Sequence, residues 1–142
     1  MLFDGVKNAR FSHRVDHTVL IVEDDPGMLE YLVRIVQEAG FRTETAVDGI
    51  EVVEKMRRLM PDIAILDLML PRYGGFELLS ELRRGVTGKI PLIIVTARFT
   101  RPEDRAKIVG QSNVAVFFEK PVPPEVLVNA LHEILETKPP TH

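Results

Sequence analysis

Short β-rich runs alternate with stretches of helical length along most of this chain, and four of the runs are apolar throughout. Such alternation is typical of βαβ units, and fully apolar strands are expected where helices cover both faces of a sheet. With right-handed crossovers, the pattern predicts an α/β fold with a doubly wound five-stranded parallel sheet of order 2-1-3-4-5 in a three-layer α/β/α sandwich. Strands are expected at 18–22, 42–46, 62–66, 91–95 and 114–118, and helices at 26–39, 49–59, 75–84, 102–110 and 124–136.

The boundaries of the first predicted helix carry recognisable end signals. Asp25 is a suitable N-cap, Pro26 suits the first helical position, and Gly40 is a suitable stop. The run at 42–46 is mostly polar, unlike the other four, which indicates a strand at the edge of the sheet.

The length of 142 residues suits one domain, which we expect at 17–137, between an N-terminal arm at 1–16 and a tail at 138–142. No apolar stretch is long enough for a membrane span or a secretion signal, so a cytoplasmic location is expected. The net charge of −3 does not favour direct binding to nucleic acid, which is itself negatively charged. Cysteine is absent, which excludes disulfides and thiol chemistry.

Each apolar run ends at a polar group, namely Glu23 and Asp24, Asp67, Thr96, and Lys120. Because ligands bind outside the carboxyl ends of parallel strands, these groups are expected to converge. Crowded carboxylates repel unless a cation compensates, and a donor set of oxygens alone favours Mg²⁺. An ionised Asp67 could then act as a nucleophile on phosphorus. The simpler alternatives are acids that stabilise the positive end of a helix, and an Asp that caps a helix or forms a turn.

Four motifs in order carry a family resemblance: Val22-Glu23-Asp24-Asp25, Leu66 to Pro71 with Gly75, Val95-Thr96-Ala97, and Phe118-Glu119-Lys120-Pro121. Together they resemble the receiver domain of two-component response regulators, of the chemotaxis-regulator-like type with a flavodoxin-like fold. The resemblance spans about residues 17–137.

The resemblance implies a role for each matching residue. Asp67 is the implied phosphoacceptor, and Mg²⁺ is implied to bind Glu23, Asp24, Asp67 and the backbone carbonyl of Met69. Thr96 is the implied switch hydroxyl, Phe117 the switch aromatic, and Lys120 the phosphate-pairing lysine before a cis bond to Pro121.

The implied partners are a histidine kinase or phosphotransfer protein and a downstream effector. The face made by the fourth helix, fifth strand and fifth helix is the implied surface that binds the effector or, alternatively, a second copy of the domain in a homodimer. The domain would catalyse only its own phosphorylation and dephosphorylation.

Two other functions compete with this interpretation. An aspartyl-phosphate phosphatase would want a second acid at position 69, which is Met. A non-phosphorylated pseudo-receiver that acts only as an interaction module would normally lack the acceptor, the acid pair or the lysine, and all are present. The sequence is compatible both with a stand-alone receiver and with the receiver domain of a larger regulator.

Overall fold

The computed structural model describes residues 17–68, 70, 74–96, 101–111 and 113–138. The predicted arm at 1–16 and residues 139–142 of the predicted tail at 138–142 lie outside this part. The strands are β1 (Thr18–Val22), β2 (Arg42–Ala46), β3 (Ile63–Leu66), β4 (Leu92–Thr96) and β5 (Val114–Glu119). The helices are α2 (Pro26–Glu38), α3 (Gly49–Leu59), α4 (Gly75–Arg83), α5 (Pro102–Val109) and α6 (Pro124–Leu135), with a 3-10 helix, η1 (Gly85–Lys89).

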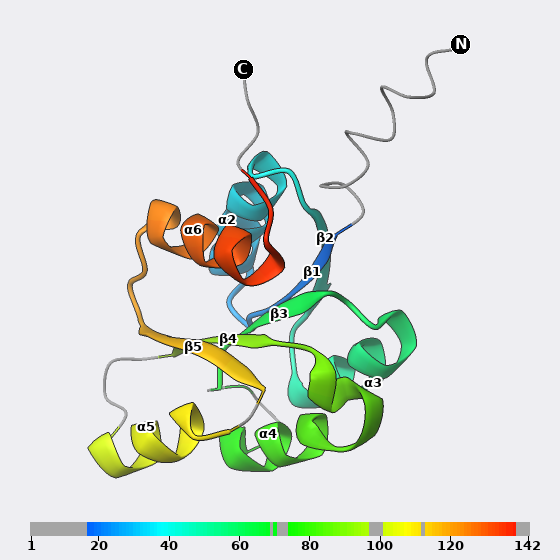
Figure 1. Ribbon diagram of the computed structural model, residues 1–142, viewed down its shortest axis with the longest axis vertical. Helices are drawn as coiled ribbons and strands as arrows, with labels where there is room; N and C mark the ends of the chain where they lie inside the picture. Colours follow the sequence, from blue (N-terminus) through cyan, green and yellow to red (C-terminus); the bar gives the residue numbers. More distant parts are fainter. Residues whose placement is uncertain (1–16, 69, 71–73, 97–100, 112, 139–142) are drawn as a thin grey trace.

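The strands form one parallel sheet of order β2-β1-β3-β4-β5, which confirms the predicted topology. Helices α2 and α6 cover one face, and α3, α4 and α5 cover the other (Figure 1). The polar strand β2 lies at one edge, as predicted, and β5 lies at the other.

Two apolar cores hold the layers together, one on each side of the sheet. Along β1, Leu20 and Val22 face the core under α3, α4 and α5, whereas Val19 and Ile21 face the core under α2 and α6. The alternation follows from the two-residue period of a strand. Each of these side chains is at most 1% exposed, and full burial of such a side chain contributes about 1.5–3 kcal/mol.

A β-bulge in β5 departs from simple alternation. Leu92 of β4 pairs with Val114, but Ile93 pairs with Val116, so Ala115 is the additional residue. Beyond the bulge, Phe117 packs against the same core as Val114. As an edge strand, β5 is only partly buried, which corrects the expectation that all four apolar strands are covered on both faces.

The start of α2 is as predicted. Asp25 is the N-cap, and its carboxylate accepts a 2.8 Å hydrogen bond from the backbone N–H of Met28. Pro26 is the first helical residue, and Gly40 follows the helix end with a φ of 102°. The capping bond ties this helix start to the loop that follows β1.

The 3-10 helix η1 was not predicted. The buried hydroxyl of Thr87 donates to the carbonyl of Leu82 at 2.6 Å, which closes the turn after α4. A Cβ at Gly88 would lie 2.3 Å from the carbonyl oxygen of Arg83, so this turn requires glycine there.

Candidate functional site

The acidic residues are positioned by the ends of neighbouring strands. Glu23 follows β1, and its backbone N–H donates to the carbonyl of Ala46 at 3.1 Å. Asp67 follows β3, and its N–H donates to the carbonyl of Val22 at 3.3 Å. These bonds continue the ladder for one residue beyond the regular strands. The backbone that carries Glu23 and Asp67 therefore belongs to the rigid sheet.

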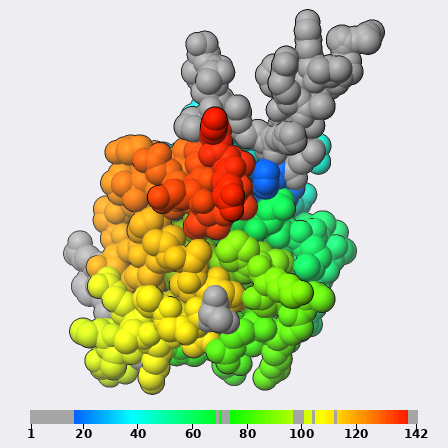
Figure 2. Space-filling view, in the orientation of Figure 1, coloured from blue at the N-terminus to red at the C-terminus, as the bar shows by residue number. Residues whose placement is uncertain are grey.

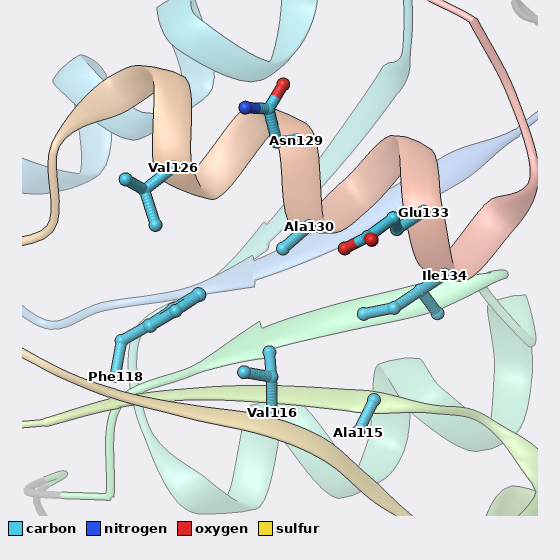
Figure 3. A pocket seen from close by; sticks show the side chains of 8 residues that line it. All are labelled: Ala115, Val116, Phe118, Val126, Asn129, Ala130, Glu133 and Ile134. Atoms are coloured by element: carbon cyan, nitrogen blue, oxygen red, sulfur yellow. The ribbon is translucent and has the colours of Figure 1, made fainter.

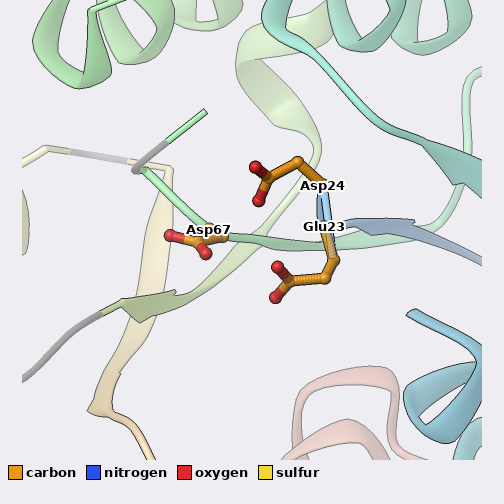
Figure 4. Close-up of side chains that lie close together, drawn as sticks. All are labelled: Glu23, Asp24 and Asp67. Carbon is orange, nitrogen blue, oxygen red and sulfur yellow. The ribbon is translucent and has the colours of Figure 1, made fainter. Parts of the chain in front are cut away.

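The carboxylates of Glu23, Asp24 and Asp67 face one another (Figure 4). One carboxylate oxygen of each lies within 4.8 Å of the others. Glu23 and Asp67 are only 3% and 5% exposed, whereas Asp24 is exposed. Three negative charges at this spacing favour a bound cation, and the donor set of oxygens alone fits Mg²⁺.

Lys120 reaches into this cluster from the end of β5. Its Nζ lies 2.8 Å from Asp67 Oδ2 and 2.8 Å from Glu23 Oε1. Glu23 Oε2 also accepts a 3.2 Å hydrogen bond from the N–H of Asp25. The peptide bond between Lys120 and Pro121 is cis, as predicted. The ammonium therefore lies beside the carboxylate that the sequence indicates as the nucleophile.

Burial lowers the pKa of Lys120, but hydrogen bonds to Asp67 and Glu23, together with their charges, more than offset this effect, so the pKa is raised above its usual value of 10.5. The stability gained from these contacts is fully present below the unfolded-state pKa and is lost as pH rises through the higher folded-state pKa. We therefore expect Lys120→Met to lower the free energy of unfolding by about 1 kcal/mol at pH 7. The difference from wild type should begin to shrink as the pH rises past about 10.5 and should disappear only above the higher folded-state pKa of Lys120.

Urea unfolding in EDTA from pH 7 to 11.5 measures this difference. Lys89→Met, a change at the end of η1, is the control for the loss of one cation. A difference between wild type and Lys120→Met that stays constant across this range would contradict the prediction.

The two residues of the implied switch, Thr96 and Phe117, lie on the neighbouring strands β4 and β5. Thr96 ends β4, is 2% exposed, and its carbonyl accepts a 2.8 Å hydrogen bond from the N–H of Lys120. Phe117 of β5 is half-buried and pairs with Ile94, which lies two residues before Thr96 on β4. Met69, whose carbonyl is the remaining implied ligand, lies outside the described residues.

Sequence reasoning missed Arg105 of α5, whose guanidinium lies over the ring of Phe117 with the two centres 4.9 Å apart. No sequence motif signals this contact, because Arg105 and Phe117 are brought together only by the packing of α5 on β5.

The face made by α5, β5 and α6 forms the yellow-to-red part of the surface (Figure 2). A pocket of about 450 Å³ lies on it between β5 and α6, lined by apolar side chains that include Val116, Phe118, Val126 and Ala130 (Figure 3). The pocket shares no lining residue with the acidic cluster.

The doubly wound sheet and the acidic cluster at its carboxyl edge define a flavodoxin-like α/β domain. The chain belongs to the response regulator receiver domain family, whose model matches residues 19–132. This assignment confirms the family that the motifs indicated, and receiver domains of this family are phosphorylation-controlled signalling domains of two-component systems.

Two curated relatives illustrate the similarity. The chain is 33% identical over 129 residues to the transcriptional regulatory protein GlrR of Escherichia coli, covering 91% of this chain and 28% of that protein. It is 32% identical over 111 residues to the DNA-binding response regulator MtrA of Mycolicibacterium smegmatis, covering 78% of this chain and 46% of that protein. The chain thus spans less than half of the length of either relative.

Solved structures show the same fold. A putative response regulator from Chloroflexus aurantiacus superposes with a TM-score of 0.74 at 31% identity, covering 84% of this chain and 98% of that one. The receiver domain of a sensor histidine kinase from Pseudomonas aeruginosa, with a magnesium ion in its active site cleft, superposes with a TM-score of 0.76 at 24% identity, covering 85% and 98%. In the described part of this chain, no helix is both long and apolar enough to cross a membrane.

Proposed function

We propose that this domain accepts a phosphoryl group on Asp67 from the phosphohistidine of a histidine kinase or phosphotransfer protein. The observation that carries the proposal is the placement of Lys120 Nζ 2.8 Å from Asp67 Oδ2, within a cluster of three carboxylates. Asp67 also lies at the carboxyl edge of the sheet, where the strand end holds its backbone in place. This site therefore combines an oxygen nucleophile with a cation that can form an ion pair with the negatively charged phosphoryl oxygens.

In the proposed step, a carboxylate oxygen of Asp67 forms a bond to phosphorus while the phosphorus–nitrogen bond of the phosphohistidine breaks. The imidazole leaves with the electron pair of that bond and takes up a proton from water, and Asp67 becomes an acyl phosphate. Lys120 then pairs with a phosphoryl oxygen in place of the carboxylate oxygen that it contacts now. Glu23 keeps the other contact of the ammonium, so Lys120 stays in position throughout.

Glu23, Asp24 and Asp67 are the residues that would hold Mg²⁺. When bound, Mg²⁺ supplies charge screening between the attacking carboxylate and the phosphoryl oxygens. The family binds magnesium in an acidic pocket, and the structure from Pseudomonas aeruginosa contains the ion in its active site cleft.

The proposal is tested with a small phosphodonor, which removes the need to know the kinase. Incubation with acetyl phosphate and Mg²⁺ is expected to add the mass of one phosphoryl group to the intact chain. Hydroxylamine should remove this mass, because it cleaves acyl phosphates and leaves phosphoserine intact. No added mass, or an adduct stable to hydroxylamine, would overturn the proposal.

We further propose that phosphorylation changes the face made by α5, β5 and α6, and that this face binds a downstream effector protein or a second copy of the domain. Phosphorylation converts the Asp67 carboxylate into an acyl phosphate whose phosphoryl group carries nearly two negative charges, and the Thr96 hydroxyl is a donor at the end of the adjacent strand. A shift of Thr96 toward the phosphate would make room for Phe117 to move. The proposed location is the cytoplasm.

Thr96→Val is expected to separate phosphorylation from output. Valine preserves the shape of this buried residue and removes only the hydroxyl, so acyl phosphate should still form. NMR with the phosphate mimic beryllofluoride should show chemical-shift changes at Phe117 and along α5 that are reduced to roughly half or less of those in wild type. Thr96→Ser, which keeps a hydroxyl, should retain them. Full-sized changes in Thr96→Val would show that the signal leaves the site by another route.

A further inference from the structure

Helix α5 (Pro102–Val109) is attached to the domain by few apolar contacts. Ile108, 3% exposed, is its one buried side chain among those the structure describes. By comparison, α4 buries Leu78, Leu79 and Leu82. An element that buries so little apolar surface gains little from packing, and its position therefore depends more on its polar contacts.

Arg105 supplies two such contacts, both to β5. Its guanidinium lies over the ring of Phe117 with a separation of 4.9 Å, and its Nη2 lies 2.7 Å from Oε1 of Glu119. Phe117 and Glu119 are two residues apart, so their side chains project from the same side of the strand. One planar cation thus bridges an aromatic face and a carboxylate, an arrangement that guanidinium suits better than ammonium.

The Nε atom of Arg105 makes this arrangement specific to the observed position of the ring. It is buried and has no hydrogen-bond acceptor among the described residues. The aromatic face of Phe117 is therefore the electron-rich group that the guanidinium faces there. If the ring turned away, the cation would lose that contact while part of it stayed out of water, which is unfavourable.

The residues that Arg105 holds are next to the phosphorylation site along β5. Glu119 pairs with Thr96 in the sheet register and directly precedes Lys120. Phe117 pairs with Ile94 on the same strand pair. A displacement of Thr96 toward a phosphoryl group would thus act on the segment of β5 that Arg105 contacts through Phe117 and Glu119.

We propose that Arg105 is a positioning residue that holds Phe117 in the position observed under its guanidinium and so sets the balance of the switch. This inference rests on the proposed function, since it concerns the switch that phosphorylation of Asp67 would drive. Losing the Arg105 contacts favours the conformation with Phe117 displaced, and that conformation is the one the phosphoryl group stabilises. Arg105 thereby limits both spontaneous activation and the rate of phosphorylation by small donors.

The test uses Arg105→Met, which removes the cation and keeps an unbranched side chain suited to a helix. The matched control is Lys107→Met. Lys107 lies on the same helix, with its Nζ 5.9 Å from the centre of the Phe76 ring. This variant therefore also removes a cation near an aromatic ring, but that ring is not Phe117. Labelling with acetyl phosphate should be about fivefold faster in Arg105→Met, equivalent to about 1 kcal/mol, and within about twofold of wild type in Lys107→Met.

The second readout needs no phosphorylation. Ring signals of Phe117 in unphosphorylated Arg105→Met should move toward their positions in beryllofluoride-treated wild type, and those of Lys107→Met should not. Unmoved ring signals, or a labelling rate that is unchanged or lower, would overturn the role of Arg105. Failure of wild type to accept phosphate would instead overturn the proposed function, and the ring signals would still decide whether Arg105 holds Phe117.

Discussion

Asp67→Asn is expected to lose phosphorylation from acetyl phosphate, with a rate at least about a hundredfold below that of wild type. The amide has nearly the same shape as the carboxylate but is a poor nucleophile, so the loss would report chemistry and not folding. The measurement is intact-mass analysis over time at saturating Mg²⁺, with circular dichroism to show that the variant is folded.

Asp62→Asn provides the matched control. Asp62 immediately precedes β3, at the opposite end from Asp67, and its Oδ2 accepts a 2.7 Å hydrogen bond from the N–H of Thr18. An asparagine oxygen can accept that bond equally well, so the variant should be labelled at the wild-type rate. Equal labelling of Asp67→Asn and wild type would show that another residue accepts the phosphoryl group.

The sheet and the position of the acidic cluster were predictable because both depend on local sequence periods. Apolar runs such as Ile63–Leu66 specify buried strands, and the carboxyl ends of parallel strands share one edge of the sheet. The structure brings Glu23, Asp67 and Lys120 to one point by this rule alone.

The details around Phe117 could not be predicted. The bulge at Ala115 decides which face of the sheet receives Phe117, and a bulge depends on the pairing of two strands and not on the sequence of one. The contact between Arg105 and Phe117 is likewise tertiary. The turn at η1 carries a local signal in Gly85, with a φ of 64°, and in Gly88, but glycine alone does not distinguish a 3-10 helix from other turns.

Magnesium binding is expected to depend on Asp24 most strongly. Within the described part of the chain, Asp24 has no ion pair or side-chain hydrogen bond, whereas Lys120 already pairs with Glu23 and Asp67. Asp24 therefore contributes a negative charge that Lys120 does not neutralise. Asp24→Asn should weaken Mg²⁺ binding at least about tenfold, or about 1.4 kcal/mol, as expected for loss of one charge near a partly exposed ion.

The neighbouring residue Asp25 gives a control within the same loop. Its carboxylate caps α2 through the N–H of Met28, so Asp25→Ala should cost about 1 kcal/mol of folding stability and leave magnesium affinity within about twofold of wild type. Calorimetric titration measures the affinities, and thermal unfolding with and without Mg²⁺ measures the linked stabilisation, which should shrink in Asp24→Asn and persist in Asp25→Ala. The reverse pattern, with affinity lost in Asp25→Ala and retained in Asp24→Asn, would show that Asp25 and not Asp24 binds the metal. We expect the first pattern because Asp25 cannot turn toward the cluster without releasing its hydrogen bond to the first turn of α2.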